Sequence, residues 1–250
     1  DQSVHGVKYF TFMTMLGYEF KRSAQFTSGG NVMKNFQGKS AVVTGAGSGI
    51  GRATALALAA EGATVAVTDI DPQSVQETVD TILAAGQDGR AFQLDVSDQQ
   101  QIGQVAADIR QALGIPSVLV NNAGIAVGGY FLDTSLESWE RIISINLMGV
   151  VHGIHTFLPL MLEQTDEAHI VNTASTAGLI MNGYAIPSGV SKHAVVPLSE
   201  SLHLELENRH ANVGVSVLCP GPVDTEIVDA SYRNLPPTIP PPDLSNEESV

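Results

Sequence analysis

The chain has 250 residues, and 44% of them are hydrophobic, which is enough to build one large core, so we expect a single folded domain. Its formal net charge of −14 argues against a nucleic-acid partner, because proteins that bind the phosphate backbone need a basic face. The single cysteine, Cys219, can form no internal disulfide, which fits a reducing cytoplasm, and its apolar neighbours favour a buried structural thiol.

The first 35 residues differ from the rest of the chain, and we expect an extension there, either non-native or an interface segment. The run from Val7 to Phe20 is too short and too polar to span a bilayer, so no membrane partner is expected. Residues 27–30, Thr-Ser-Gly-Gly, predict a flexible joint. Half of the aromatic residues of the chain lie near this segment: Tyr9, Phe10, Phe12, Tyr18, Phe20, Phe26 and Phe36.

From Ser40 onward, short runs of β-branched residues alternate with segments of helical period. Strands are predicted over residues 41–44, 64–68, 91–94, 117–121, 169–173 and 213–218. Apolar residues at helical spacing predict helices at Val75, Val79, Ile82 and Leu83, at Ile102, Val105 and Ile109, and over 138–164 and 188–210. Apolar strands that alternate with helices form parallel sheets covered on both faces, so the fold class is α/β, a doubly wound parallel sheet spanning residues 36–250.

A glycine-rich loop follows the first strand of this sheet. The sequence TGAGSGIG places Gly45, Gly49 and Gly51 directly before a helical segment. A dinucleotide pyrophosphate must approach the backbone closely and lies at a helix N-terminus, where N–H groups and the helix dipole stabilise negative charge. The order strand, glycines, helix therefore predicts a dinucleotide site, with these contact residues: Gly45, Ser48, Gly49, Ile50 and Gly51.

Asp69 and Ile70 follow the second strand, 18 residues beyond Gly51. A carboxylate at this place accepts hydrogen bonds from the adenosine ribose hydroxyls and repels a 2′-phosphate, so the expected cofactor is NAD and not NADP. The alternative is a solvated turn aspartate before Pro72.

Further motifs occur in a fixed order between residues 35 and 226. They are TGAGSGIG, Asp95-Val96, NNAG at 121–124, Asn146 in SINLMG, VNTAS ending at Ser175, Lys192 in SGVSK and PGPVDT at 220–225. With these motifs the chain resembles the short-chain dehydrogenase/reductase family. The resemblance implies a single-domain, Rossmann-like oxidoreductase that transfers a hydride between a nicotinamide and a secondary alcohol or ketone.

The resemblance also assigns cofactor contacts. It implies that Asp95, with Val96, lies at the adenine and that residues after the last strand hold the nicotinamide carboxamide. The implied floor under the adenosine ribose is Asn122, Ala123 and Gly124, and the implied carboxamide contacts are Pro220, Gly221, Val223 and Thr225. Read without the resemblance, NNAG could be a turn and Thr225 a helix N-cap.

Four groups carry the chemistry that the resemblance implies. Asn146 would hold a water, Ser175 would donate a hydrogen bond to the substrate oxygen, and Lys192 would bind the nicotinamide ribose and lower the pKa of a tyrosine phenol. The family places this phenol four residues before the lysine and thirteen after the serine. Both counts lead to position 188, which is serine.

Ser188 leaves three explanations open. The first is a tyrosine-to-serine change in an otherwise ordinary enzyme, the second is a noncatalytic NAD-binding module or scaffold, and the third is that nearby Tyr184 replaces the phenol. Because Asn146, Ser175 and Lys192 are all present, the first explanation is favoured over the second, with reduced activity. Pro187 belongs in the first turn of the following helix and separates Tyr184 from it, which disfavours the third.

The remaining features predict no metal, an apolar substrate and self-association. His152 and His155 lack a third ligand at metal spacing. The prolines in 234–243 exclude a regular strand or helix, so we expect the C-terminus to be short of the family's seventh strand, with the 213–218 strand exposed or covered by the N-terminal extension. Apolar residues near Leu179 suggest a small apolar alcohol or ketone. The helices over 138–164 and 188–210 are expected to pair in a homo-oligomer, a dimer or tetramer.

Overall fold

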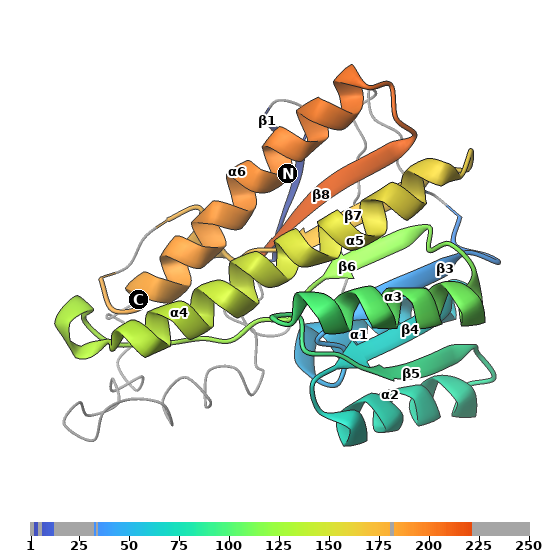
Figure 1. The fold of residues 1–250 in the computed structure, drawn as a ribbon, viewed down its shortest axis with the longest axis horizontal. Coiled ribbons are helices and arrows are strands. Elements are labelled where there is room, and N and C mark those ends of the chain that lie inside the picture. The colour runs from blue at the N-terminus through green and yellow to red at the C-terminus, as the bar shows by residue number, and fades with distance from the viewer. Residues whose placement is uncertain (1–2, 5–6, 13–32, 34, 181–182, 222–250) are drawn as a thin grey trace.

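A computed structural model describes residues 3–4, 7–12, 33, 35–180 and 183–221. Its centre is a parallel sheet with helices packed against both faces, as Figure 1 shows. The strands are β3 (Ser40–Thr44), β4 (Thr64–Asp69), β5 (Gly89–Gln93), β6 (Val118–Asn121), β7 (Ala168–Thr173) and β8 (Val213–Pro220). They lie in the order β8-β7-β6-β3-β4-β5, and every neighbouring pair is parallel. The predicted doubly wound α/β fold is therefore confirmed.

The helices between the strands begin where the sequence provides caps. The side chain of Asp71 accepts hydrogen bonds from two backbone nitrogens at the start of α2, and Asp98 does the same for α3. Pro72 at the first position of α2 needs no N–H partner there. The helices of this layer structure are α1 (Gly49–Ala60), α2 (Pro72–Ala84), α3 (Gln99–Leu113), α4 (Leu136–Ile143), α5 (Gly149–Glu163) and α6 (Ile186–Asn208).

The predicted helix over 138–164 is divided into α4 and α5 by a π-helical turn, η2 (Ser144–Met148). The run from Leu136 to Glu163 is long and apolar enough to cross a membrane by length and composition, and 39% of its most apolar window is buried in the domain. Core helices of soluble proteins have the same composition, so the run by itself decides nothing about a membrane.

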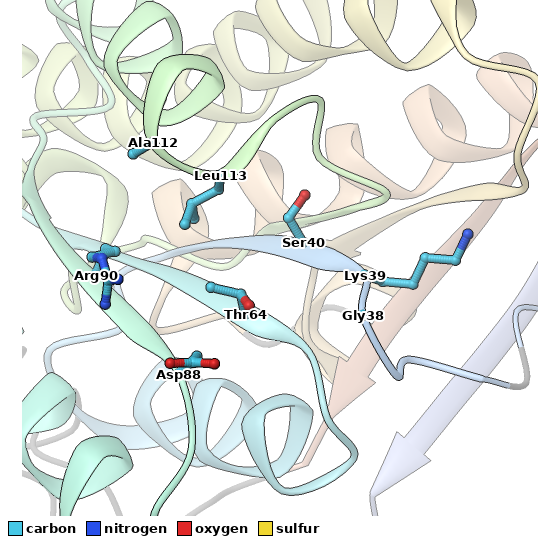
Figure 2. Close-up of a pocket in the computed structure, with 8 residues that line it drawn as sticks. All are labelled: Gly38, Lys39, Ser40, Thr64, Asp88, Arg90, Ala112 and Leu113. Carbon is cyan, nitrogen blue, oxygen red and sulfur yellow. The ribbon is translucent and has the colours of Figure 1, made fainter.

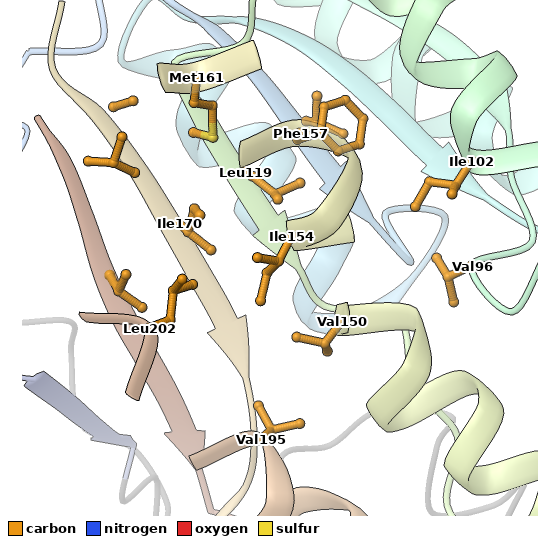
Figure 3. Packing of buried hydrophobic residues seen from close by; sticks show 14 of the residues in the cluster. Val96, Ile102, Leu119, Val150, Ile154, Phe157, Met161, Ile170, Val195 and Leu202 are labelled. Carbon is orange, nitrogen blue, oxygen red and sulfur yellow. The ribbon is translucent and has the colours of Figure 1, made fainter. Parts of the chain in front are cut away.

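Two apolar clusters hold the layers together, one on each face of the sheet. The larger cluster joins α3, α5 and α6 to one face, and Figure 3 shows its centre, where Phe157 and Ile170 are fully buried. The smaller cluster joins α1 and α2 to the other face and includes Met33. Burial of such side chains contributes about 1.5–3 kcal/mol each, which makes the sheet a rigid support for the loops at its edges.

The N-terminal part of the chain adds two strands to the sheet, β1 (Ser3–Val4) and β2 (Val7–Phe12). Strand β2 pairs in parallel with β8, with Lys8 opposite Ser216 and Phe12 opposite Pro220. Strand β1 pairs antiparallel with β2. In the described residues β8 is therefore an inner strand, covered by the N-terminal segment.

Candidate functional site

The loop between β3 and α1 has the backbone shape that close approach of a ligand requires. Gly45 and Gly49 have φ angles of +63° and +50°, a region that residues with a Cβ rarely occupy. A Cβ on Gly51 would overlap the Gly45 carbonyl oxygen and lie 2.5 Å from Asn122 Nδ2. The loop is thus folded tightly against the start of α1 and against the segment after β6.

The N-terminus of α1 opens at this loop. Ser48 is the N-cap residue, yet its side chain makes no capping hydrogen bond, and Ser48 and Gly49 are both exposed. The first N–H groups of a helix need partners, and an anion supplies them. Ile50 is half-buried and Gly51 buried in the same turn. These residues fit the pyrophosphate of a dinucleotide, which would lie against the backbone of Gly45 to Gly51.

Asp69 ends β4 beside the same loop. Its Oδ2 accepts a hydrogen bond from the Gly47 nitrogen at 3.0 Å, and its Oδ1 accepts one from the Asp71 nitrogen at 3.2 Å. The next residue, Ile70, is 61% exposed. A fixed carboxylate and an exposed apolar side chain here suit the adenosine half of the cofactor.

Thr44 is a site residue that the sequence analysis missed. Its Oγ1 accepts hydrogen bonds from the backbone nitrogens of Asn122 at 2.9 Å and Ala123 at 3.0 Å. In return, Asn122 Nδ2 donates to the carbonyl oxygens of Thr44 and Gly45 at 3.1 and 3.3 Å. The signal in the sequence was a threonine at the last position of a predicted apolar strand, directly before the glycine loop. This network joins the glycine loop to the Asn122-Ala123-Gly124 segment.

Asp95 and Val96 follow β5 at the same edge of the sheet. Asp95 Oδ1 accepts hydrogen bonds from the nitrogen and hydroxyl of Ser97 at 2.9 and 2.6 Å, which fixes the turn. Val96 is buried, and a Cβ on Gly149 of α5 would lie 2.7 Å from its side chain. The turn is held against the long helix, where an adenine ring would find one polar and one apolar neighbour.

Asn146 lies in the π-helical turn and is fully buried. Its Oδ1 accepts from the Ile125 nitrogen at 2.8 Å, and its Nδ2 donates to the Ile125 oxygen at 3.0 Å and to Ser191 Oγ at 3.1 Å. Both N–H donors of the amide are used in these bonds, and one lone pair of Oδ1 is left for a further partner. The extra residue of a π turn re-aims side chains and is frequent at functional sites.

Helix α6 places Lys192 next to Gly124 and Asn146. A Cβ built on Gly124 would lie 3.2 Å from Asn146 Oδ1 and 3.4 Å from Lys192 Nζ, so both groups flank Gly124. The ammonium donates a hydrogen bond to the Thr173 oxygen at 2.8 Å. Burial lowers the pKa of Lys192 to about 8, against a smaller opposing effect of the Cys219 thiol.

Ser175 and Cys219 complete this part of the site. Ser175 caps the short helix η3 (Thr176–Gly178), and its Oγ accepts from the Ala177 nitrogen at 3.1 Å, which leaves the hydroxyl proton for another acceptor. Cys219 in β8 is buried, and burial raises the pKa of its thiol to about 11 against the opposing effects of the Ser175 backbone and Lys192. The thiol is therefore a structural neighbour and a poor nucleophile.

Ser188 lies in the first turn of α6 and bonds to the loop after β6. Its Oγ accepts from the Val127 nitrogen at 3.0 Å and donates to the Val127 oxygen at 3.2 Å. The only proton of the hydroxyl is thus engaged with backbone. Tyr184 precedes α6, and its ring makes an edge contact with Tyr130, with centroids 5.6 Å apart.

Pro220 is buried at the end of β8, and Gly221 follows it half-buried at the same edge. The other two predicted carboxamide contacts, Val223 and Thr225, lie outside the described residues, as does the proline-rich segment 234–243.

Among the residues that the structure describes, no group of three or more His, Cys, Asp or Glu is placed to hold a metal ion.

A shallow cavity of about 320 Å³ lies at the opposite, amino-terminal end of the central strands (Figure 2). Lys39, one of its cations, is paired with Asp166 at 2.8 Å. The last residues of α3 also line it, and helix C-termini repel anions. Doubly wound sheets bind ligands at the carboxyl ends of their strands, so this cavity is not the cofactor site.

Residues 39–235 match the family model described as short chain dehydrogenase. The chain belongs to the short-chain dehydrogenase family. The glycine loop, the Asn122-Ala123-Gly124 segment, Asn146, Ser175 and Lys192 all lie within the matched range. The resemblance found in the sequence motifs is therefore confirmed.

Solved and curated short-chain dehydrogenases agree with this assignment. The chain is 42% identical to a short-chain dehydrogenase/reductase from Burkholderia phymatum solved in complex with NAD, with a TM-score of 0.78 over 84% of this chain and 74% of that one. It is 41% identical over 196 residues to "Probable oxidoreductase EphD" of Mycobacterium tuberculosis, covering 78% of this chain and 33% of the relative. It is 31% identical to the CLA biosynthesis dehydrogenase/reductase of Lactiplantibacillus plantarum, covering 78% of this chain and 68% of the relative. The chain thus spans about a third of the length of EphD.

Proposed function

We propose that the protein is an NAD-dependent oxidoreductase that transfers a hydride between the nicotinamide and a secondary alcohol or ketone. The observation that carries this proposal is the convergence of Asn146 Oδ1 and Lys192 Nζ on Gly124, beside a glycine loop that fits a pyrophosphate. When bound, the nicotinamide would accept or supply the hydride at this edge of the sheet. The residues of the chain bind the cofactor, orient the substrate oxygen and exchange a proton with it.

The preference for NAD over NADP rests on Asp69. The carboxylate is held by the Gly47 and Asp71 nitrogens, so it cannot turn away from a 2′-phosphate without losing both hydrogen bonds. The relative from Burkholderia phymatum was solved with NAD, which supports the same choice.

Reduced activity is part of the proposal, because position 188 carries no phenol. A phenol ionises near pH 10 and an adjacent ammonium lowers that value, whereas an aliphatic hydroxyl is far too basic to serve in the same way. Loss of a positioned acid or base typically lowers the rate by a factor of about 10² to 10⁴. A noncatalytic NAD-binding module is the second candidate, and the Ser188 hydrogen bonds to Val127 favour it, since they use the hydroxyl for structure.

A small apolar alcohol or ketone is the proposed substrate. Tyr130, Phe131, Leu179 and Ile180 are all exposed next to the site-bearing segments. We further propose a homo-oligomer, because α4, α5 and α6 expose large apolar side chains such as Leu136, Leu162 and Leu204. Light scattering that gives a monomer at micromolar concentration would contradict the homo-oligomer. We propose a cytoplasmic location, because the single cysteine can form no internal disulfide.

The proposed function is tested by an assay with NAD and a panel of secondary alcohols, together with a direct NAD titration. NAD binding with slow turnover that Lys192→Ala abolishes supports the enzyme. NAD binding without turnover, also after Ser188→Tyr, supports the module. Absence of NAD binding would overturn both candidates.

A further inference from the structure

The site offers few groups that can exchange a proton with a substrate. Ser188 Oγ uses its one proton on the Val127 oxygen at 3.2 Å, and Ser175 Oγ has no partner that could take its proton among the hydrogen bonds described above. The Cys219 thiol is buried and holds its proton, because its pKa is raised to about 11. Of the described groups around Gly124, the Lys192 amine is the one whose pKa burial lowers, to about 8.

Lys192 Nζ is also well placed for this role. It lies next to Gly124 and Asn146, and its hydrogen bond to the Thr173 oxygen uses one of three N–H groups. The Thr173 carbonyl oxygen fixes the direction of the amine by accepting this hydrogen bond. A carbonyl is too weak a base to take the proton from the ammonium, so the proton stays on Lys192. Among the described residues, no carboxylate is paired with Lys192. Its pKa is lowered by burial and raised, to a smaller extent, by the Cys219 thiol.

We propose that Lys192 Nζ is itself the acid/base of this chain, exchanging the proton with the substrate oxygen through one water in the space that a phenol would occupy. This inference rests on the proposed function. Serine at position 188 ends roughly 4 Å short of a phenol oxygen, and a water that bridges such a gap transmits a proton at a modest entropic cost.

The proton balance of this step is simple. In alcohol oxidation the substrate carbon loses a hydride to the nicotinamide, and the substrate hydroxyl loses its proton through the water to the neutral Lys192 amine. In ketone reduction the carbonyl carbon would gain a hydride from the reduced nicotinamide, and the Lys192 ammonium would give up one proton that reaches the substrate oxygen through the water. The amine would then be reprotonated from solvent. Oxidation therefore requires the neutral amine, and reduction requires the ammonium.

The titratable surroundings of Lys192 are few, so its ionisation can be followed. Strand β7 presents the Thr173 carbonyl, the turn after β6 presents Gly124, η2 presents Asn146, and β8 presents the Cys219 thiol. On α6 itself, the neighbouring His193 has its Nδ1 at 2.8 Å from the Ala177 oxygen. Cys219 is therefore the one described titratable group from another element that acts on Lys192.

The first test needs no cofactor or turnover. Competitive acetylation of the cofactor-free protein over a range of pH, read by mass spectrometry of the Lys192 peptide with the Lys39 peptide as reference, gives the pKa of the Lys192 amine. The same midpoint must then appear in the kinetics. Oxidation of an alcohol should fall about tenfold in kcat/KM for each pH unit below it, and ketone reduction should fall likewise above it. A pH-independent rate, or a labelling midpoint more than one unit from the kinetic one, would overturn the inference.

Amine rescue separates proton transfer from cofactor binding by Lys192. Lys192→Gly should lose at least about 10² in turnover, and added primary amines should restore part of it in proportion to their basicity. Rescue that is independent of amine basicity, or no rescue while the variant still binds NAD, would show that Lys192 only holds the cofactor. If the unmodified chain binds NAD but turns over no alcohol at any pH, the oxidoreductase proposal fails as well, and this distinguishes the two failures.

Discussion

The Asp69 carboxylate accepts a hydrogen bond from the Gly47 nitrogen at 3.0 Å, which ties the end of β4 to the glycine loop. We expect Asp69→Ala to remove the preference for NAD, which should be at least about tenfold, or about 1.4 kcal/mol, in the unmodified chain. Fluorescence titration with NADH and NADPH measures both dissociation constants. The control is Asp71→Ala, which removes a charge two residues away and the α2 cap, and should cost about 1 kcal/mol of stability while leaving the cofactor preference intact. Equal affinities in the unmodified chain would contradict the prediction.

Ser188→Tyr should raise turnover by at least about 10² with little change in NAD affinity, because it restores a phenol near the Lys192 ammonium. Ser188→Phe is the matched control, since it places the same ring without the hydroxyl and also removes the hydrogen bonds to Val127. Steady-state rates and NAD titrations of both variants show whether the hydroxyl or only the ring raises turnover. A Phe variant as active as the Tyr variant would mean that filling space, and not proton exchange, is the missing element.

Gly51→Ala should abolish NAD binding and destabilise the fold by several kcal/mol, because its Cβ would overlap the Gly45 carbonyl. Gly103→Ala serves as the control, since Gly103 lies inside α3 with open space around its Cβ position. That substitution should stabilise the helix by about 0.5–1 kcal/mol. Urea unfolding monitored by circular dichroism compares the two variants, and similar midpoints would refute the reasoning.

Thr44→Val should weaken the site without changing its shape. The substitution keeps the volume but leaves the Asn122 and Ala123 nitrogens without their acceptor, which typically costs about 1–3 kcal/mol. The free energy of unfolding measures the loss, and NAD affinity should fall with it. Thr54→Val, at a hydroxyl that bonds only within α1, is the control that should keep NAD affinity. An unchanged NAD affinity in Thr44→Val would separate Thr44 from the site.

Lys192 should make stability depend on alkaline pH. Its pKa in the folded protein is about 8, below the usual 10.5, so the unfolded chain binds more protons between these values and stability rises with pH across that window. Cys219 acts the other way, because its pKa is raised from 9.0 to about 11 and stability falls with pH between those values. The comparison with Lys192→Met removes the Cys219 contribution except for the smaller effect of Lys192 on the pKa of that thiol. The variant should be more stable than the unmodified chain at pH 7, by at most about 3 kcal/mol, because Lys192 is partly exposed. This difference in stability should shrink between pH 8 and 10.5. A difference that is constant with pH would contradict the lowered pKa.

The sheet and its glycine loop were predictable because they follow from local patterns. Runs such as residues 41–44 and 64–68 are apolar on both faces, which only a covered parallel sheet accommodates. The glycine loop was predictable for a similar reason, since its glycines stand directly between a strand and a helix. The positive φ angles of Gly45 and Gly49 were learned only from the structure.

The tertiary contacts of the site were not predictable in this way. Nothing local in SINLMG signals that Asn146 sits in a π turn with its amide bonded to Ile125, 21 residues away. The bond between Ser188 and Val127 joins residues 61 apart, and its partner is a backbone group that carries no sequence signature. The division of the 138–164 helix follows from that turn and was missed with it.

The pairing of β2 with β8 sets an order of events for the newly made chain. Lys8 and Ser216 face each other across the ladder although 208 residues separate them. A ribosome adds about 5–20 residues per second, so β2 waits roughly 10–40 s before its partner strand exists. Strand β7, by contrast, pairs with β8 across 45 residues, from Ala168 to Val213. Because closing the longer loop costs more entropy, we expect the central strands to assemble first and β2, which is made before them, to join the sheet after them.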